Sequence, residues 1–340
     1  MRSITATLGK NRFRCFLFAL AIALPTVSFG QTPQAAASSL RERLQARLDE
    51  RRAGTWQQPG THRFTLEFGG QERGYLVHVP PQYRPGTALP VVLGLHGGGG
   101  NMDIQASAHY ALVDKADAAG FLAVFPNGYS RFPGGKLATW NAGHCCGAAR
   151  DTGSDDVGFV RAVLAQVEQR WSVDPRRVFA TGMSNGAMMA YRLACELPER
   201  IAAIAAVAGT DNTVACPGTR AVAVLHIHAQ DDTHVLFNGG AGPDAFRDPQ
   251  AVTAFTAVPE TLRRWAAHNH CGPRPERTLD VPGAHCDRYP SCAAPVQLCV
   301  TDTGGHSWPG GSKVRAVGSA PSQALHATDM AWDFFTRAVP

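Results

Sequence analysis

Residues 177–197 read RVFATGMSNGAMMAYRLACEL. Arg177–Ala180 has the composition of a strand, Ala187–Leu197 has helical periodicity, and the pentapeptide Gly182-Met-Ser-Asn-Gly186 stands between them. A G-x-S-x-G sequence between a strand and a helix predicts a nucleophile elbow, a sharp turn that points the Oγ of Ser184 away from the sheet. The same residues also fit a serine that merely caps a helix after a glycine turn, so the prediction depends on the rest of the chain.

Strand-like and helix-like segments alternate along most of the chain. Continuous apolar runs typical of strands buried on both faces occur at Pro90–Leu95, Phe121–Phe125, Ile201–Val207, Val222–Ile227 and Val296–Val300. Helical patterns occur at 108–119, Asp156–Val173, Val258–His268 and Ala324–Ala338, and His62–Phe68 with Gly74–Val79 alternates like a hairpin. The sequence therefore predicts an α/β domain over residues 61–340, with a mostly parallel central sheet and helices on both faces.

A serine hydroxyl is a poor nucleophile and needs a base nearby. In folds that carry such an elbow, an acid and then a histidine follow the serine in the sequence, each on a loop after a strand. Asp232 follows the strand-like run 222–228, and His306 follows the last apolar strand within the sequence GGHSWPG at 304–310. We expect His306 to accept the proton of Ser184 and Asp232 to orient the imidazole, so these three residues are the candidate catalytic triad.

Four other histidines are weaker candidates for the base. His226 and His228 lie in or at the end of a strand and precede the acid, so packed or hydrogen-bonded core histidines are expected there. His268 and His270 lie at the end of a helix, where histidines are ordinary. His306 therefore remains the candidate base.

The oxyanion that forms during acyl transfer needs two preorganised N–H donors. The backbone N–H of Asn185 directly follows the candidate nucleophile and is the first donor by position. A run of four glycines after His96 offers the second donor, which we assign to Gly98. A simple flexible turn is the alternative interpretation of that glycine run.

Two tryptophans stand next to these motifs. Trp140 and Trp308 are expected to flank the site, where they either stack on an aromatic acyl group or pack the loops around it. The sequence predicts no metal site and no cofactor.

The N-terminus has the pattern of an export signal. A basic segment ending at Arg14 precedes an apolar run, Cys15–Val27, which is too short to span a bilayer comfortably. Small residues at Ser28 and Gly30 suit a signal peptidase, so residues 1–30 are predicted to be a signal peptide and the mature protein to be secreted. An uncleaved membrane anchor is the alternative. Residues 31–60 are predicted to be a helix or linker outside the catalytic domain.

The formal net charge of +5 is mostly a property of this export signal. Arg2, Lys10, Arg12 and Arg14 supply four of the positive charges and no acidic residue offsets them, which leaves the mature chain at about +1. The charge therefore indicates no nucleic-acid partner, and no stable membrane anchor is expected after the signal is cleaved.

Eight cysteines remain after Cys15, an even number that favours disulfides in an exported protein. A zinc site is the alternative, but no C-x-x-C pair occurs. Residues 286–289 and 296–299 read as a hairpin in which Cys286 faces Cys299, and Cys271 with Cys292 is then the natural neighbouring pair. The pairing stays open for four cysteines, namely Cys145, Cys146, Cys195 and Cys216.

Five motifs together resemble one family of secreted enzymes. They are His96–Asn101 (HGGGGN), Trp140–Gly147 (WNAGHCCG), Asp155–Phe159 (DDVGF), Gly182–Gly186 (GMSNG) and Gly304–Gly310 (GGHSWPG). The chain from about His62 to its C-terminus is similar to the secreted polyhydroxybutyrate depolymerase and feruloyl esterase group, α/β-hydrolases of the carbohydrate-esterase type. The resemblance implies an α/β-hydrolase fold and does not cover residues 31–60.

The family pattern implies Ser184 as the nucleophile and His306 as the base. Its acid usually closes an H-G-T-x-D stretch, with which HAQDD at 228–232 aligns, so the resemblance implies Asp232 as the acid. The two residues after His228 depart from that pattern, and Asp231 therefore remains the alternative.

The resemblance implies a secreted carboxylic-ester hydrolase, and we expect a feruloyl ester or another small aromatic ester as its substrate. A polyester or oligoester depolymerase of the polyhydroxybutyrate type is the alternative within the same class. The triad also permits amide hydrolysis, of a peptide or polyaspartate for example. A secreted binding protein on an inactive hydrolase scaffold is the alternative from a different class, although every expected catalytic residue is present.

Overall fold

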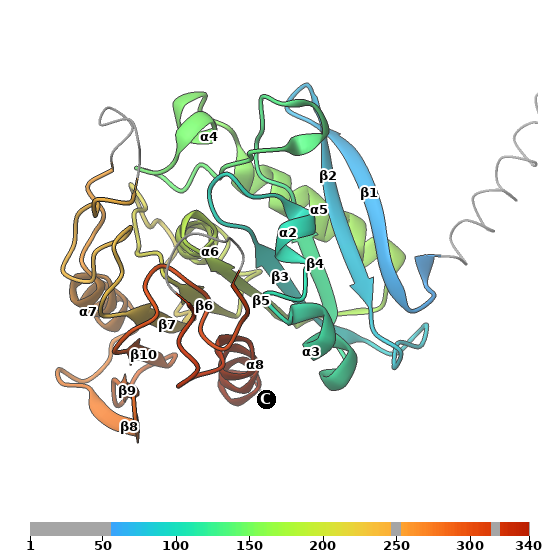
Figure 1. Ribbon diagram of the computed structural model, residues 1–340. Coiled ribbons are helices and arrows are strands. Elements are labelled where there is room, and N and C mark those ends of the chain that lie inside the picture. Colours follow the sequence, from blue (N-terminus) through green and yellow to red (C-terminus); the bar gives the residue numbers. More distant parts are fainter. Residues whose placement is uncertain (1–55, 246–252, 314–319, 340) are drawn as a thin grey trace, which may run out of the picture. The chain divides into compact units, whose positions relative to one another are not determined.

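A computed structural model describes residues 56–245, 253–313 and 320–339 (Figure 1). Its strands are β1 (Gly60–Phe68), β2 (Gln71–Val79), β3 (Leu89–Leu95), β4 (Leu122–Pro126), β5 (Val173–Met183), β6 (Ala203–Val207), β7 (Ala223–Ala229), β8 (Glu276–Val281), β9 (Ala284–Arg288) and β10 (Val296–Thr301). Its helices are α2 (Met102–Gln105), α3 (Leu112–Ala119), α4 (Gly147–Asp151), α5 (Asp156–Arg170), α6 (Asn185–Glu196), α7 (Val258–His268) and α8 (Ala327–Ala338), with a short 3-10 turn, η1, at Pro133–Gly135.

The centre of the sheet is parallel. β4, β3, β5, β6, β7 and β10 lie side by side in this order, and each neighbouring pair runs parallel. Antiparallel strands continue the sheet on both sides, β2 and β1 beyond β4, and β9 and β8 beyond β10. This mostly parallel sheet, with helices between its strands, confirms the expected α/β-hydrolase fold.

Helices cover both faces of the sheet, and the alternation of side chains along each strand explains how. Val91, Leu93 and Leu95 of β3 pack in one hydrophobic cluster with α5, α6 and α7, whereas Val92 packs in the other cluster with α3 and α8. Successive side chains of a strand point to opposite faces, so a strand covered on both faces must be apolar throughout. All five residues of β6 are buried for the same reason.

Two strands differ from the sequence pattern. β5 begins at Val173 instead of Arg177, because the preceding helix α5 already ends at Arg170. β8 has no counterpart in the sequence prediction, since most of its side chains are exposed and it contains no apolar run. It pairs only with β9 at the edge of the sheet, and a strand without a buried face leaves little periodic signal.

The N-terminal predictions fall on residues that the structure does not describe. The expected signal peptide, residues 1–30, and most of the expected linker, residues 31–60, lie there and stay predictions. β1 begins at Gly60, close to the expected start of the catalytic domain. Within the described ranges, no helix combines the length and the apolar character needed to cross a membrane.

Disulfides pair all eight cysteines that follow Cys15. Both predicted bridges are confirmed, and Cys286 and Cys299 are direct partners in the β9–β10 register. Of the pairings left open, one joins α6 to the segment before β7 and the other joins adjacent residues. The four bridges are Cys145–Cys146, Cys195–Cys216, Cys271–Cys292 and Cys286–Cys299.

Candidate active site

The candidate catalytic residues follow three strands of the parallel part of the sheet. Ser184 comes directly after β5, Asp232 comes three residues after β7, and His306 comes on the loop after β10. β5, β6, β7 and β10 are successive neighbours and run in the same direction. Their carboxyl ends therefore share one edge of the sheet, which is where sites lie in α/β folds.

Ser184 occupies a strained turn between β5 and α6. Its φ of 56° and ψ of −122° lie outside the helical and strand regions, and its backbone N–H donates to Val207 at 2.8 Å. The flanking glycines make the turn possible. A Cβ at Gly182 would lie 2.7 Å from the carbonyl oxygen of Leu95, and one at Gly186 would collide with the same oxygen. The backbone geometry is that of the predicted elbow.

Asp232 and His306 are in direct contact. The distance from His306 Nδ1 to Asp232 Oδ2 is 2.9 Å, and Asp232 is almost fully buried. Asp231 has a different partner, because its carboxylate accepts the backbone N–H of Gly305 at 2.8 Å. The structure thus places Asp232 against the imidazole and Asp231 against the loop that carries it.

The surroundings of Asp232 keep its carboxyl group ionised. Burial on its own would raise the pKa of Asp232, but its close contacts with the imidazoles of His228 and His306 bring it well below its ordinary value. Its Oδ1 also accepts the backbone N–H groups of His234 and Val235, at 2.8 and 3.0 Å. The result is a fixed anion beside the imidazole of His306.

The glycine loop after β3 lies against the elbow. A Cβ built on Gly98 would lie 3.6 Å from Cβ of Asn185, so the two expected oxyanion donors are neighbours. The N–H of Gly99 donates to Ala138 and that of Gly100 to Gly97, a pattern that does not use the N–H of Gly98. As the first residue of α6, Asn185 has a backbone N–H without an acceptor inside its helix.

His96 fixes this loop, a role that sequence reasoning missed. It is fully buried, its Nδ1 lies 2.9 Å from the carbonyl oxygen of Gly97, and its Nε2 accepts the N–H of Gly128 at 2.9 Å. Burial lowers the pKa of His96 to about 4, so the ring is neutral and can accept at Nε2. Its position at the head of the HGGGGN motif was the available signal.

Residues 74–255, more than half of the chain, match the family model of the esterase PHB depolymerases. The chain belongs to this family. It is a carboxylic ester hydrolase, as its named relatives are esterases.

Two curated relatives and one solved structure illustrate the likeness. Feruloyl esterase B of Piromyces equi is 29% identical over 69% of this chain and 42% of its own length, so the match spans less than half of that relative. "Probable feruloyl esterase C" of Aspergillus clavatus is 27% identical over 86% of this chain and 93% of its own. The acetyl xylan esterase from Aspergillus awamori superposes with a TM-score of 0.56 at 16% identity, covering 81% of this chain and 99% of that one, which shows the shared fold.

Neither tryptophan of the esterase offers a ring face for stacking on an acyl group. Trp140 is fully buried and Trp308 is 3% exposed. The indole N–H of Trp140 donates to the carbonyl of His96 at 2.9 Å, and that of Trp308 donates to Thr328 at 3.0 Å. The burial of both rings fits the alternative interpretation, packing of the loops, and the substrate-binding role of these residues stays a prediction.

Trp140 links the elbow to the loops around it through its main chain. The side chain of Asn185 accepts the backbone N–H of Trp140 at 2.7 Å and donates to its carbonyl at 3.0 Å. The same carbonyl accepts the N–H of Cys146 at 3.0 Å. Residue Asn185 thus combines a candidate oxyanion donor in its backbone with an anchor in its side chain.

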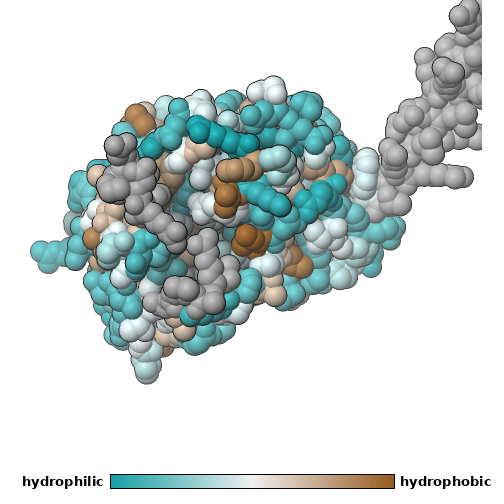
Figure 2. All heavy atoms as spheres, turned by 45° about the horizontal axis from the view of Figure 1, so that its top comes forward, coloured by the Kyte–Doolittle hydropathy of each residue, from teal (hydrophilic) through white to brown (hydrophobic). Residues whose placement is uncertain are grey.

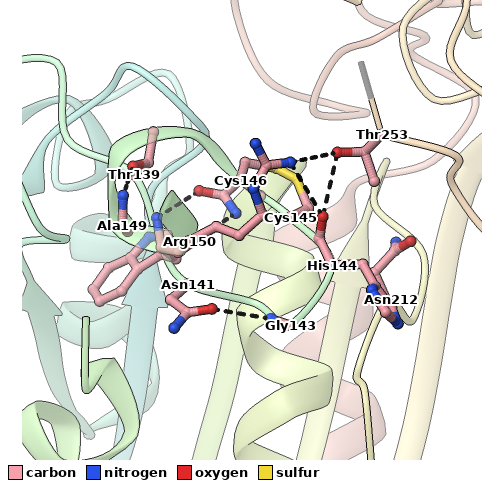
Figure 3. The surroundings of a disulfide bond; sticks show 12 residues. Thr139, Asn141, Gly143, His144, Cys145, Cys146, Ala149, Arg150, Asn212 and Thr253 are labelled. Atoms are coloured by element: carbon pink, nitrogen blue, oxygen red, sulfur yellow. Dashed lines mark hydrogen bonds between the residues drawn. A yellow bond between two sulfur atoms is a disulfide. The ribbon is translucent and has the colours of Figure 1, made fainter. Parts of the chain in front are cut away.

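The Cys145–Cys146 bridge lies in a loop that is tied to its surroundings on several sides (Figure 3). The backbone N–H of His144 donates to Asn212 at 3.0 Å, and Arg150 and Thr253 each lie 3.4 Å from the His144 carbonyl oxygen. Both cysteines are buried. The bridge therefore tightens a loop that supports the elbow through Trp140.

Apolar side chains are exposed beside the glycine loop. Phe132 is 55% and Leu137 is 60% exposed, and Ala138, next to Leu137, exchanges backbone hydrogen bonds with Gly99 and Gly100. Figure 2 turns the top of Figure 1 toward the viewer and shows small groups of hydrophobic side chains on that face. These residues, and not the two tryptophans, offer apolar surface near the candidate oxyanion donors.

Among the described residues, Asp232, His234 and His306 bring possible ligand atoms within 4.8 Å of one another. The rings of His234 and His306 stack with centroids 4.5 Å apart and planes 14° apart. Nitrogen lone pairs lie in the ring plane, so two stacked rings do not direct them toward one ion. The arrangement suits a proton-accepting histidine beside its carboxylate.

Proposed function

We propose that Ser184, His306 and Asp232 form the catalytic triad of this esterase, and that its substrate is a feruloyl or related small aromatic ester. The observation that carries the mechanism is the 2.9 Å contact between His306 and the buried, ionised Asp232, at the sheet edge that also carries the elbow of Ser184. A histidine oriented by a carboxylate is the base that a serine nucleophile needs.

The reaction follows from these positions. Ser184 Oγ attacks the ester carbonyl carbon while Nε2 of His306 takes its proton, and the oxyanion accepts the N–H groups of Asn185 and Gly98. The intermediate collapses, and His306 returns the proton to the departing alcohol. Water then attacks the acyl-enzyme by the same steps. Within the described ranges Ser184 Oγ has no hydrogen-bond partner, and such contacts commonly form only when substrate binds.

Two observations support an aromatic ester as the substrate. The relatives described above include proteins named feruloyl esterases. The exposed Phe132 and Leu137, on a segment bonded to the glycine loop, offer apolar contact to a ring. The matched family model favours a second candidate, a hydroxybutyrate oligoester. We also propose secretion, because four disulfides suit an oxidising compartment.

The triad is tested by matched substitutions. Ser184→Ala and Asp232→Asn should each lower kcat by at least ~10⁴, whereas Asp231→Asn should cost far less because Asp231 bonds to the backbone of Gly305 and not to the ring of His306. An organophosphonate should label the wild type at Ser184. Near wild-type turnover by Ser184→Ala, or a larger loss at Asp231 than at Asp232, would contradict the assignment.

The substrate is tested with a panel of methyl ferulate, p-nitrophenyl esters of increasing chain length and hydroxybutyrate oligomers. We expect the highest kcat/KM on methyl ferulate. A clear preference for the oligomers would establish the second candidate instead, and labelling without turnover on any ester would favour a binding protein.

A further inference from the structure

Three buried polar side chains form a row behind Asp232. The hydroxyl of Tyr191 lies 2.8 Å from His226 Nδ1, and His226 Nε2 lies 3.1 Å from His228 Nδ1. His228 Nε2 in turn lies 3.3 Å from Asp232 Oδ2, the oxygen that also contacts His306. All three side chains are at most 1% exposed. Titratable groups are seldom buried so completely, and the proposed reaction does not explain why these three are.

One contact determines the direction of every hydrogen bond in the row. His228 Nε2 lies 2.8 Å from the carbonyl oxygen of Val235, which can only accept, so Nε2 carries the proton. In a neutral ring Nδ1 of His228 must then accept, and Nε2 of His226 donates to it. Nδ1 of His226 accepts in its turn, and the Tyr191 hydroxyl donates. The donors therefore all point from Tyr191 toward His228, whose own Nε2–H donates to Val235 and lies beside Oδ2 of Asp232.

The interior keeps the two histidines from both being charged. His226 and His228 stack with centroids 5.3 Å apart, so two positive rings would repel at close range. Burial lowers the pKa of His226 well below its ordinary value, and the adjacent His228 lowers it further. Burial likewise raises the pKa of the Tyr191 hydroxyl, which therefore keeps its proton.

We propose that His228 is a positioning residue. Tyr191 and His226 hold it in one tautomer, so that its Nε2–H, which donates to the carbonyl of Val235 at 2.8 Å, also faces Oδ2 of Asp232 at 3.3 Å beside His306. This role presupposes the proposed triad. Oδ1 of Asp232 is already held by two backbone N–H groups, so His228 and His306 are both directed to Oδ2. Among the described residues, the titratable groups that face Asp232 or its loop include His228, His234, His306, Asp231 and Asp244.

A second imidazole N–H beside the carboxylate changes how strongly Asp232 attracts the proton of His306. With the N–H of His228 present, part of the carboxylate charge is neutralised, and protonated His306 gains less from it. Without that N–H, His306 should stay protonated to a higher pH and be unavailable as a base there. The free energy of a contact with a charged group is large enough to move the midpoint of a pH–activity profile by about one pH unit.

The test measures how kcat/KM for p-nitrophenyl acetate falls toward acid pH in the wild type and three variants. The midpoint is the pH at which kcat/KM has fallen to half, and His228→Leu should raise it by about one pH unit. His228→Gln keeps an N–H group at a similar reach and should restore most of the midpoint. Tyr191→Phe removes only the first donor and should raise the midpoint by less.

His78→Gln is the matched control. His78 is another buried histidine, on β2, bonded to Thr61 and Asp117 and not to Asp232. Its replacement should lower stability and leave the midpoint unchanged, which separates positioning from mere support of the fold. ¹⁵N NMR of the wild type reports the tautomers without any substitution, and should find the proton on Nε2 of both His226 and His228.

An unchanged midpoint in folded His228→Leu, or a proton on Nδ1 of neutral His228, would overturn the role of this residue. If His228→Leu does not fold, Tyr191→Phe and the NMR measurement are used instead. An unchanged midpoint in Tyr191→Phe together with a proton on Nδ1 of His228 would then overturn the proposal. Persisting activity of Ser184→Ala would overturn the proposed function itself. If Ser184→Ala is inactive but His228→Leu does not change the midpoint, the proposed triad is supported and only the positioning role of His228 is ruled out.

Discussion

His96 makes the stability of the esterase depend on pH. The folded chain keeps this ring neutral down to about pH 4, whereas a histidine in the unfolded chain binds a proton near pH ~6.5. Keeping His96 neutral therefore contributes its full share to the free energy of unfolding above about pH 6.5. That share falls by roughly 3 kcal/mol as the pH falls toward 4. The lowered pKa of His226 acts in the same direction.

Urea unfolding of the wild type and His96→Gln at pH 7 and pH 4.5 measures this effect. The variant should be less stable at pH 7, because glutamine cannot keep both ring contacts, one with Gly97 of the glycine loop and one with Gly128 after β4. It should nevertheless lose less stability than the wild type on acidification. An equal loss in both proteins would show that His96 does not cause the dependence.

Chain order restricted the choice of candidate catalytic residues. Ser184, Asp232 and His306 were selected because an elbow, an acid and a histidine had to follow strands in that order, and the structure places Asp232 against His306. The burial of individual side chains could not be predicted from the sequence in the same way. Trp140 and Trp308 stand beside motifs whether they stack on a substrate or pack a loop, and only their neighbours in space show that both are enclosed. The direction of the Tyr191 row likewise depends on a carbonyl brought in by the fold.

The segment between β4 and Trp140 should determine how well the esterase binds an aromatic acyl group. Phe132→Ala with Leu137→Ala removes most of its exposed apolar surface. We expect KM for methyl ferulate to rise by roughly ten-fold, because contacts of this size are worth about 1–2 kcal/mol. The control is p-nitrophenyl acetate, whose acyl group is too small to reach this surface. Equal effects on both substrates would mean that the double variant disturbs the glycine loop instead.

Elements with a buried face were predictable, and those without one were not. The apolar runs of β3, β4, β6, β7 and β10 were found from the sequence, because two covered faces require such runs. The exposed β8 was missed. α3 begins at Leu112, four residues later than expected, since Ala111 takes a left-handed conformation with φ of 51°.

The Cys286–Cys299 bridge should stabilise the whole molecule. It joins β9 to β10, the strand that leads to His306. Cys286→Ser with Cys299→Ser should lower the free energy of unfolding by about 2–4 kcal/mol and reduce activity as well. Cys195→Ser with Cys216→Ser is the control, which should lower Tm with less effect on kcat because Cys195 lies at the far end of α6 from Ser184. A Tm unchanged by either pair would contradict this account.

Alternation of strands and helices was sufficient to predict the architecture of the catalytic domain, because connections in such folds allow few topologies. The same reasoning could not pair Cys145 with Cys146, since facing register in a hairpin identifies only partners on opposite strands.

The separation of the candidate triad along the chain has a consequence for how activity arises during folding. Ser184 lies at the end of β5, but His306 arrives only when β10 has paired with β7. Contacts between segments so far apart form slowly, because a long loop must close first. Refolding followed by hydrolysis should therefore lag behind burial of Trp140, whose hydrogen-bond partners His96 and Asn185 both precede β6. With the proposed triad, we expect a newly made chain to acquire its nucleophile early and its base last, and to stay inert until its C-terminal strands have joined the sheet.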